Sequence, residues 1–308
     1  MYARYALGRL LGTLPTLLAI VTAAFFLMRL APGGPFDEEQ TVPPEIRANL
    51  EAAYGLDRPV LVQYWRYLGG LVHGDLGPSY RMKDYRVAEI IGSGLPVTMS
   101  IGAAALLLAV LLGVPLGLLA GRRHNGWVDH AVMATALVGI AVPNFVVAPL
   151  LALAFGIGLG WLPVGGWEPG NPRYMILPVV TLAAPFVAYV ARLTRGSLLE
   201  VLQSPFIRTA RAKGIGGAAI LRRHALKPTL LPVLSFLGPA AAALLTGSLV
   251  VEQVYGLPGV GRYFVQGAVN RDYTLVMGMV VFYATLILAL NLVVDLAYGW
   301  LDPRIRHD

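Results

Sequence analysis

The side chains that most often carry out chemistry are few in this sequence, and they do not cluster along it. The chain has no cysteine, which excludes disulfide frameworks, Cys-ligated zinc and thiol catalysis. No Gly-x-Ser-x-Gly nucleophile elbow occurs. The five histidines are scattered without a His-Glu-x-x-His pair: His73, His124, His130, His224 and His307. The sequence therefore predicts neither a hydrolase nor a metal site.

The lysines exclude a nucleotide-binding loop of the Walker type. The only lysines are Lys83, Lys213 and Lys227, and none of them follows a glycine. A Gly-Lys-Ser/Thr phosphate loop is therefore impossible. We predict that the chain is not an enzyme and binds no cofactor of its own, so that any ATP-driven work would need a separate ATPase.

The densest group of charges lies in segment 192–227, which carries eight basic residues and one acidic residue. Within it, Ser204 and Pro205 are typical of a helix start, and Gly214 of a helix stop. We expect a short helix over about 204–214 with a cationic face made by Arg208, Arg211 and Lys213. A helix of this length is marginal alone. It must pack on its own bundle, on anionic headgroups or on a cytoplasmic partner.

The composition indicates the elements that would position this helix. Hydrophobic residues make up 56% of the 308-residue chain and charged residues only 13%, about half of the ~25% usual in soluble domains. Long stretches without charge can each hold the ~20 apolar residues that cross a bilayer. We predict a single all-α integral membrane domain over 1–308 with six transmembrane helices near 9–30, 96–120, 131–156, 175–193, 229–251 and 274–297.

The distribution of basic residues sets the orientation. Segment 192–227 has a net charge of +7, whereas segment 31–95 has −3. By the positive-inside rule the first is cytoplasmic and the second external, which places the N and C termini in the cytoplasm. The excess of basic over acidic residues thus reflects the membrane topology, and a nucleic-acid partner is not expected. Segment 31–95 should contain helices near 43–55 and 59–72, either as a stabilising lid or as a docking platform.

Uncharged polar residues in the spans are candidates for a translocation path. They are Asn144, Thr246, Ser248 and Asn291, and prolines at 143 and 149 interrupt the third span beside the first of them. The alternative is that these groups bond between helices.

Two acidic residues lie near span ends. Glu252, at the end of the fifth span, is a candidate external gate or loop residue, with a capped loop as the alternative. For Asp295 we expect a structural contact with Arg192 or another basic residue at the inner ends.

Several blocks of the sequence resemble a known family. The central block is Phe206-Ile207-Arg208-Thr209-Ala210-Arg211-Ala212-Lys213-Gly214, followed by His224-Ala225-Leu226-Lys227-Pro228. Others are Arg29-Leu30-Ala31-Pro32-Gly33, His73-Gly74-Asp75-Leu76-Gly77-Pro78-Ser79, Arg192-Leu193-Thr194-Arg195-Gly196-Ser197, Val251-Glu252-Gln253-Val254-Tyr255-Gly256-Leu257-Pro258-Gly259-Val260-Gly261, Asn270-Arg271-Asp272-Tyr273 and Leu301-Asp302-Pro303-Arg304-Ile305-Arg306. Together they resemble the membrane subunits of bacterial ABC importers of the peptide-permease family, most closely the B-type subunits of its oligopeptide branch.

This resemblance implies a type I ABC importer transmembrane-domain fold in the bacterial inner membrane. It also implies a homologous second permease subunit, two cytoplasmic ATPase subunits that bind ATP and Mg, and an external peptide-binding protein. The 204–214 helix would be the coupling helix seated in an ATPase groove, with Phe206, Arg208, Thr209, Ala210, Arg211, Lys213 and Gly214 as its contact residues. The superfamily signature begins Glu-Ala-Ala, whereas this chain has Arg208-Thr209-Ala210, as the peptide branch does.

The cargo is not set by any single residue. Importers of dipeptides, nickel complexes and glutathione have related subunits, and an ion-coupled secondary carrier is the alternative from another class. Few buried carboxylates and no evident inverted repeat argue against that carrier. At Gly214 we expect a left-handed backbone, and we expect Gly214→Asp to uncouple ATP hydrolysis from transport.

Overall fold

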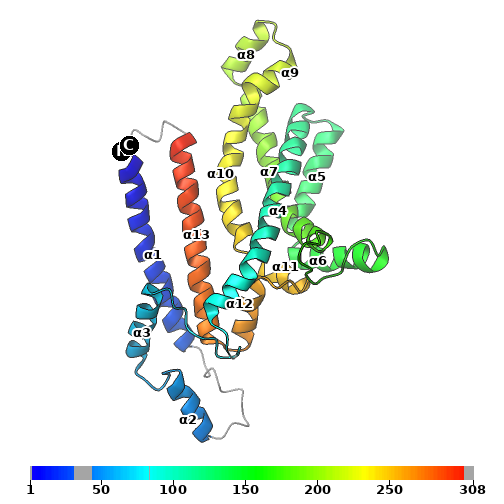
Figure 1. Cartoon of the computed structure of the whole chain (residues 1–308). Coiled ribbons are helices and arrows are strands. Elements are labelled where there is room, and N and C mark those ends of the chain that lie inside the picture. Colours follow the sequence, from blue (N-terminus) through cyan, green and yellow to red (C-terminus); the bar gives the residue numbers. More distant parts are fainter. Residues whose placement is uncertain (1, 31–43, 83, 302–308) are drawn as a thin grey trace.

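The computed structural model describes residues 2–30, 44–82 and 84–301, and within these ranges the chain is helical, without a strand (Figure 1). The helices of the first half are α1 (Tyr2–Leu30), α2 (Pro44–Ala53), α3 (Val60–Val72), α4 (Val87–Arg122), α5 (Trp127–Ala141) and α6 (Asn144–Leu151), continued by the π-helical stretch η1 (Ala152–Gly158). Those of the second half are α7 (Arg173–Leu202), α8 (Pro205–Ala212), α9 (Gly217–Ile220), the π-helical stretch η2 (Leu221–Ala225), α10 (Leu226–Leu245), α11 (Leu249–Val254), α12 (Val260–Val269) and α13 (Tyr273–Leu301).

The core of the molecule is the pair α4 and α7, flanked by α5 and α10. The two central helices approach closely because α4 presents glycine to α7. A Cβ on Gly117 would lie 2.4 Å from the backbone oxygen of Ala191, and one on Gly113 would lie 2.7 Å from the side chain of Val190. Only glycine permits this spacing, so the two helices pack through their backbones.

A second layer consists of α1 against α13, with α3 covering the lower part of α1 (Figure 1). The Tyr64 hydroxyl of α3 hydrogen-bonds the Thr22 hydroxyl of α1 at 2.7 Å, and its ring packs on Phe25. The two helices predicted near 43–55 and 59–72 are present as α2 and α3.

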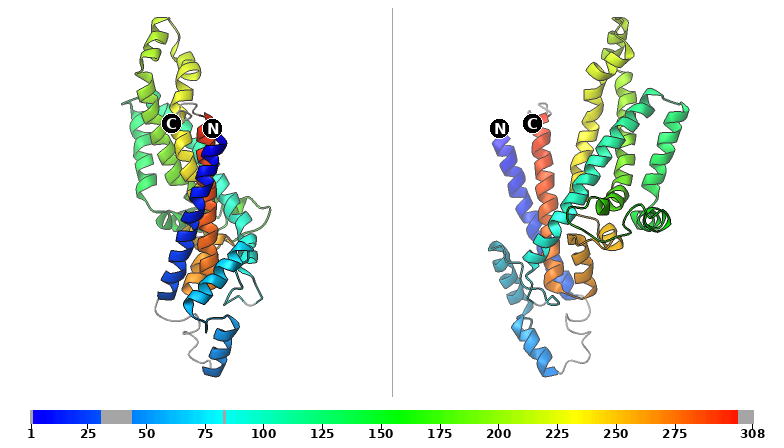
Figure 2. Two further views of the ribbon diagram at one scale, coloured as in Figure 1. Left: turned by 90° about the vertical axis from the view of Figure 1, so that its left-hand side faces the viewer. Right: turned by 45° about the vertical axis from the view of Figure 1, so that its right-hand side comes forward.

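The α8 hairpin lies at one extreme of the molecule, here called the α8 end (Figure 1). There α7 extends to Leu202, and α9, η2 and α10 form one continuous rod back from Gly217. Helix α1 begins and helix α13 ends toward this same end (Figure 2). Much of the predicted segment 192–227 is thus rigid helix, since α7 continues nine residues beyond the predicted limit of 193.

Two predicted spans are broken. The stretch 131–156 is not one helix, because α5 and the α6–η1 pair meet at Val142 and Pro143 with a bend of 103°. Proline disfavours helical backbone in the residue before it, and Val142 is accordingly extended, with ψ at 117°. The helix predicted over 229–251 ends at Leu245 and resumes at Leu249, after Gly247 with φ at +86°.

Five helical stretches among the described residues are long and apolar enough to cross a bilayer, and the bent α5–α6 pair would be a sixth if it counts as one span. The other predicted spans begin or end earlier or later than expected; α4 starts at Val87, for instance, rather than near 96.

Candidate functional site

Helix α8 begins as the sequence predicts, except at its cap. Ser204 has the extended backbone of an N-cap residue, with ψ at 153°, and Pro205 occupies the first helical position. The Ser204 hydroxyl, however, donates to the Val201 carbonyl at 2.6 Å and does not accept from the first turn of α8. Ser204 is therefore at the N-cap position that the sequence predicts, but its hydroxyl closes the end of α7 and does not cap α8.

The end of α8 is a Schellman motif. Gly214 has φ at +74°, and its amide donates to the Arg211 carbonyl at 2.9 Å. The Ile215 amide donates to the Ala210 carbonyl at 3.2 Å, which completes the motif. The left-handed backbone expected at Gly214 is confirmed, and the turn that it permits directs the chain back toward α9.

One face of α8 is covered by its own chain. Ile207 and Ala210 are buried in a cluster with Leu198 of α7, Ile220 of α9 and Ala225 of η2. This packing explains how so short a helix is stable. Ala210, which we predicted among the contact residues, lies on this inward face.

The opposite face of α8 is exposed and cationic. Phe206, with 49% of its surface accessible, lies beside the exposed side chains of Arg208, Thr209, Arg211 and Lys213. Arg208 donates from Nε and Nη2 to the Gln203 carbonyl at 3.3 and 3.2 Å, which orders its guanidinium at the start of the helix. The exposed set combines an aromatic ring with three positive charges, a composition suited to a partner surface with an apolar pocket and acidic residues.

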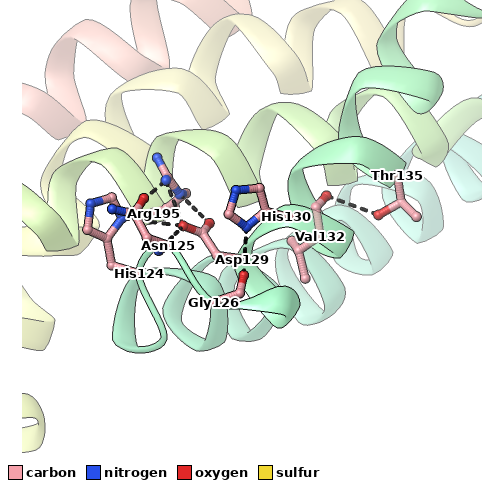
Figure 3. A network of polar contacts seen from close by, with 8 residues as sticks. All are labelled: His124, Asn125, Gly126, Asp129, His130, Val132, Thr135 and Arg195. Atoms are coloured by element: carbon pink, nitrogen blue, oxygen red, sulfur yellow. Dashed lines mark hydrogen bonds and ion pairs between the residues drawn. The ribbon is translucent and has the colours of Figure 1, made fainter.

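An ion pair with a buried carboxylate joins α5 to α7 (Figure 3). Arg195 donates from Nε and Nη2 to the two carboxylate oxygens of Asp129 at 2.5 and 2.7 Å. The Asn125 amide donates to the same carboxylate at 3.0 Å, and His124 Nδ1 lies 3.3 Å from it. The Asp129 side chain is only 3% exposed.

Sequence reasoning missed this pair, which we call the Asp129–Arg195 clamp. Asp129 was visible as the last charge before a long apolar stretch, and Arg195 as part of a matching block, but 66 positions separate them. The expected contact of Asp295 with Arg192 cannot be placed beside it, because the Asp295 side chain lies outside the described residues. Arg192 itself is exposed on α7.

At the far end of the molecule Glu252 is buried in α11 and organises a turn. Its carboxylate accepts from the Thr98 hydroxyl of α4 at 2.8 Å and from the Arg262 amide in the first turn of α12 at 3.2 Å. A Cβ on Gly259 would lie 2.3 Å from this carboxylate. The carboxylate thus satisfies amides at the start of α12 and ties α11, α12 and α4 together. This geometry corresponds to a capped loop, which was the alternative to an external gate in the sequence analysis. A gating role for Glu252 stays a prediction.

Tyr255, like the two residues of the Asp129–Arg195 clamp, was not singled out as a site residue from the sequence. Its hydroxyl lies 2.9 Å from the Thr181 hydroxyl of α7 and donates to the Ala148 carbonyl of α6 at 3.0 Å. Its own carbonyl accepts from the Gly166 amide at 2.7 Å. Tyr255 therefore fixes the bent α6 against α7 and α11.

The four residues predicted to line a path do not form one group. The Thr246 hydroxyl donates to carbonyls of its own helix, Ala242 at 2.9 Å and Ala243 at 3.1 Å, and Ser248 accepts from the Val251 amide at 3.2 Å as the N-cap of α11. Asn144 is half-buried at the start of α6, which packs against α11, whereas Asn291 is exposed in the half of α13 toward the α8 end.

Comparison with known families and proteins gives a consistent result. Residues 113–307 match the family described as "Binding-protein-dependent transport system inner membrane component", and residues 2–102 match its N-terminal companion. The chain belongs to this family. It is 51% identical over 304 residues to the oligopeptide transport system permease protein OppB of Escherichia coli K12, with 99% of each chain covered. It is 42% identical to the dipeptide transport system permease protein DppB of Bacillus subtilis, over 99% of this chain and 98% of that one.

A likeness in structure supports the family's fold. A structure of the methionine ABC transporter MetNI, described as inward facing, superposes with a TM-score of 0.53 at 17% identity, covering 67% of this chain and 95% of that one. The resemblance to the peptide-permease family predicted from the sequence blocks is therefore confirmed, as are the all-helical class and the membrane character.

Proposed function

We propose that this chain is the membrane-spanning permease subunit of an ATP-driven importer that moves oligopeptides, delivered by an external binding protein, across the bacterial inner membrane. The near full-length identity to OppB supports the oligopeptide cargo, since identity to the dipeptide permeases is lower, at 42% and 37%. The chain works with a homologous second permease subunit and two ATPase subunits, where ATP and Mg bind. Dipeptides are the second candidate cargo.

The proposed topology has six spans, with the bent α5–α6 pair counted as one, and both termini in the cytoplasm. Two observations support it. Helix α1 begins and helix α13 ends toward the α8 end (Figure 2), and segment 192–227 has a net charge of +7. The α8 end is then cytoplasmic, and the far end, with α2 and α3, is external.

The observation that carries the proposal is the construction of α8. The helix is fixed to α7 and η2 by Ile207 and Ala210, while Phe206, Arg208, Arg211 and Lys213 face outward at the extreme of the molecule. A partner that moves this face moves α7 and the α9–α10 rod with it. Through the Asp129–Arg195 clamp the displacement also reaches α5, and thus the bent α6 beyond it. The chain converts the movement of an ATPase into a rearrangement of its spans.

The translocation path in this proposal lies between the two permease subunits. Asn144, Thr246, Ser248 and Asn291 remain its candidate polar residues. Thr246 and Ser248 already serve local backbone contacts, so they would offer a peptide only weak additional bonds. Weak binding suits a carrier of varied peptides, because selection is then left to the binding protein.

The test is transport by the complete complex in proteoliposomes. We expect uptake of a labelled pentapeptide that requires the binding protein, the second permease subunit and ATP hydrolysis. Uptake that persists without ATP under a proton gradient would contradict the proposal and favour a secondary carrier. Uptake of dipeptides alone would identify dipeptides as the cargo in place of oligopeptides and would leave the proposed mechanism unchanged.

A further inference from the structure

A cavity of about 280 Å³ lies at the far end of the molecule, between α1, α3, the segment after α3 and α13. Its walls combine two guanidinium groups, Arg29 of α1 and Arg66 of α3, with aromatic and apolar side chains such as Phe25 and Met277. It lies apart from α8, from the clamp and from the residues predicted for the path.

Arg29 is held in position by neutral groups. Its Nε and Nη2 donate to the Gln63 amide oxygen at 3.0 and 2.7 Å, and its guanidinium lies 4.1 Å from the centre of the Phe25 ring. The Gln63 amide nitrogen in turn donates to the carbonyls of Leu56 and Arg58 at 3.0 and 2.8 Å. The Arg29 guanidinium is therefore fixed by an amide oxygen and an aromatic ring, neither of which carries a charge that would neutralise it.

Within the described part of the chain, no carboxylate lies within ion-pair distance of Arg29 or Arg66. Asp75 also lines the cavity, but its carboxylate accepts from the Gly77 amide at 2.9 Å and lies 3.7 Å from Arg86. Among the described residues the cavity lining thus carries a net positive charge, which favours an anionic ligand.

Tyr67 contributes a third polar group to the wall of the cavity. Tyr67 lines the cavity, and its hydroxyl is buried without a hydrogen bond to any described residue. A buried hydroxyl without a partner is costly, so a ligand oxygen within its reach would be stabilised. Two cations and one free hydroxyl form the donor set that a phosphate group accepts.

The surroundings indicate which phosphate compound binds. Leu27 and Leu30, beside Arg29 on α1, are 66% and 79% exposed, and Leu61 and Trp65 of α3 are 63% and 68% exposed. In the proposed topology these residues lie at the external membrane–water interface of the inner membrane. Lipid headgroups lie there, and acyl chains run along the exposed leucines. We propose that the cavity binds the phosphate of a phospholipid headgroup in the outer leaflet, so that the lipid joins α3 to α1. This inference rests on the proposed topology but not on the cargo.

The test is native mass spectrometry of the purified complex titrated with phosphatidylglycerol after delipidation, with inorganic phosphate in a parallel arm. We expect the variant Arg29→Gln/Arg66→Gln to retain the lipid at least tenfold less than the wild type. Tyr67→Phe, which removes one hydroxyl and keeps the ring packing, should retain it about fivefold less. The matched control is Arg58→Gln, an arginine of the same segment whose side chain is 69% exposed.

Equal lipid retention by the wild type, by Tyr67→Phe and by the double variant would overturn the proposal. Binding of millimolar inorganic phosphate without binding of phosphatidylglycerol would overturn the lipid assignment as well. Neither readout involves transport, so failure here is distinguishable from failure of the proposed importer function.

Discussion

Replacing Gly214 by aspartate should separate ATP hydrolysis from peptide transport while the chain still inserts into the membrane. Gly214 is the left-handed residue of the Schellman motif that ends α8, with φ at +74°. A Cβ at this position would meet no atom within 4 Å. The perturbation is therefore confined to the backbone and the local charge, without a steric clash.

The magnitude follows from two contributions. A side chain in the left-handed region costs about 1 kcal/mol relative to glycine. A carboxylate at the negative end of a helix dipole costs a further ~0.3–1 kcal/mol, and it also reduces the positive charge of the α8 face. Their sum, about 1.5 kcal/mol, shifts the equilibrium between the formed and the unravelled last turn of α8 about tenfold. A helix of this length has little stability to spare.

The assay is the number of peptides transported per ATP hydrolysed in proteoliposomes, at equal amounts of assembled complex. We expect this ratio to fall by up to tenfold for Gly214→Asp and less for Gly214→Asn, because asparagine tolerates the left-handed region and carries no charge. Gly216→Ala is the control, since Gly216 has φ at −66° and open space around it. A wild-type ratio for Gly214→Asp would show that the last turn of α8 does not couple ATP hydrolysis to transport.

Two further predictions concern contacts that join the helices, one near α8 and one at the far end of the molecule. Asp129→Asn leaves the Arg195 guanidinium without its anionic partner and should lower the thermal midpoint of the complex by roughly 5 °C, measured by tryptophan fluorescence; an unchanged midpoint would mean that the pair contributes no stability. Gly259→Ala places a methyl group 2.3 Å from the Glu252 carboxylate and should reduce the yield of folded protein in detergent chromatography far more than Gly216→Ala does.

The spans could be predicted because charge is excluded from the bilayer core, which leaves a direct trace in the sequence. Their ends could not, because a helix does not stop where its apolar stretch stops. Helix α7 continues from Arg192 to Leu202, since Leu198 packs there against Ile207 of α8. The bend at Pro143 had a local signal in the proline, but its angle of 103° depends on tertiary contacts such as that of Tyr255 with Ala148.

The α8 site was predictable to a similar degree. Pro205 and Gly214 mark its ends by backbone chemistry, and the charges of Arg208, Arg211 and Lys213 are visible in the sequence. The side that faces inward was not, because burial of Ala210 requires Ile220 and Ala225, which approach only after the chain reverses at Gly214. The Asp129–Arg195 clamp was missed because its two residues are 66 positions apart in the sequence and meet only when α5 packs against α7.

The most direct test of the account is whether the exposed face of α8 contacts an ATPase subunit. Since the chain has no cysteine, Thr209→Cys creates a unique thiol on that face, and Val72→Cys, at a residue that is 85% exposed at the far end, is its matched control. In the assembled complex, a short thiol-directed photo-crosslinker at 209 should join the chain to an ATPase subunit, and the same reagent at 72 should not. Crosslinks from 209 to lipid alone, or to no ATPase subunit, would contradict the central claim.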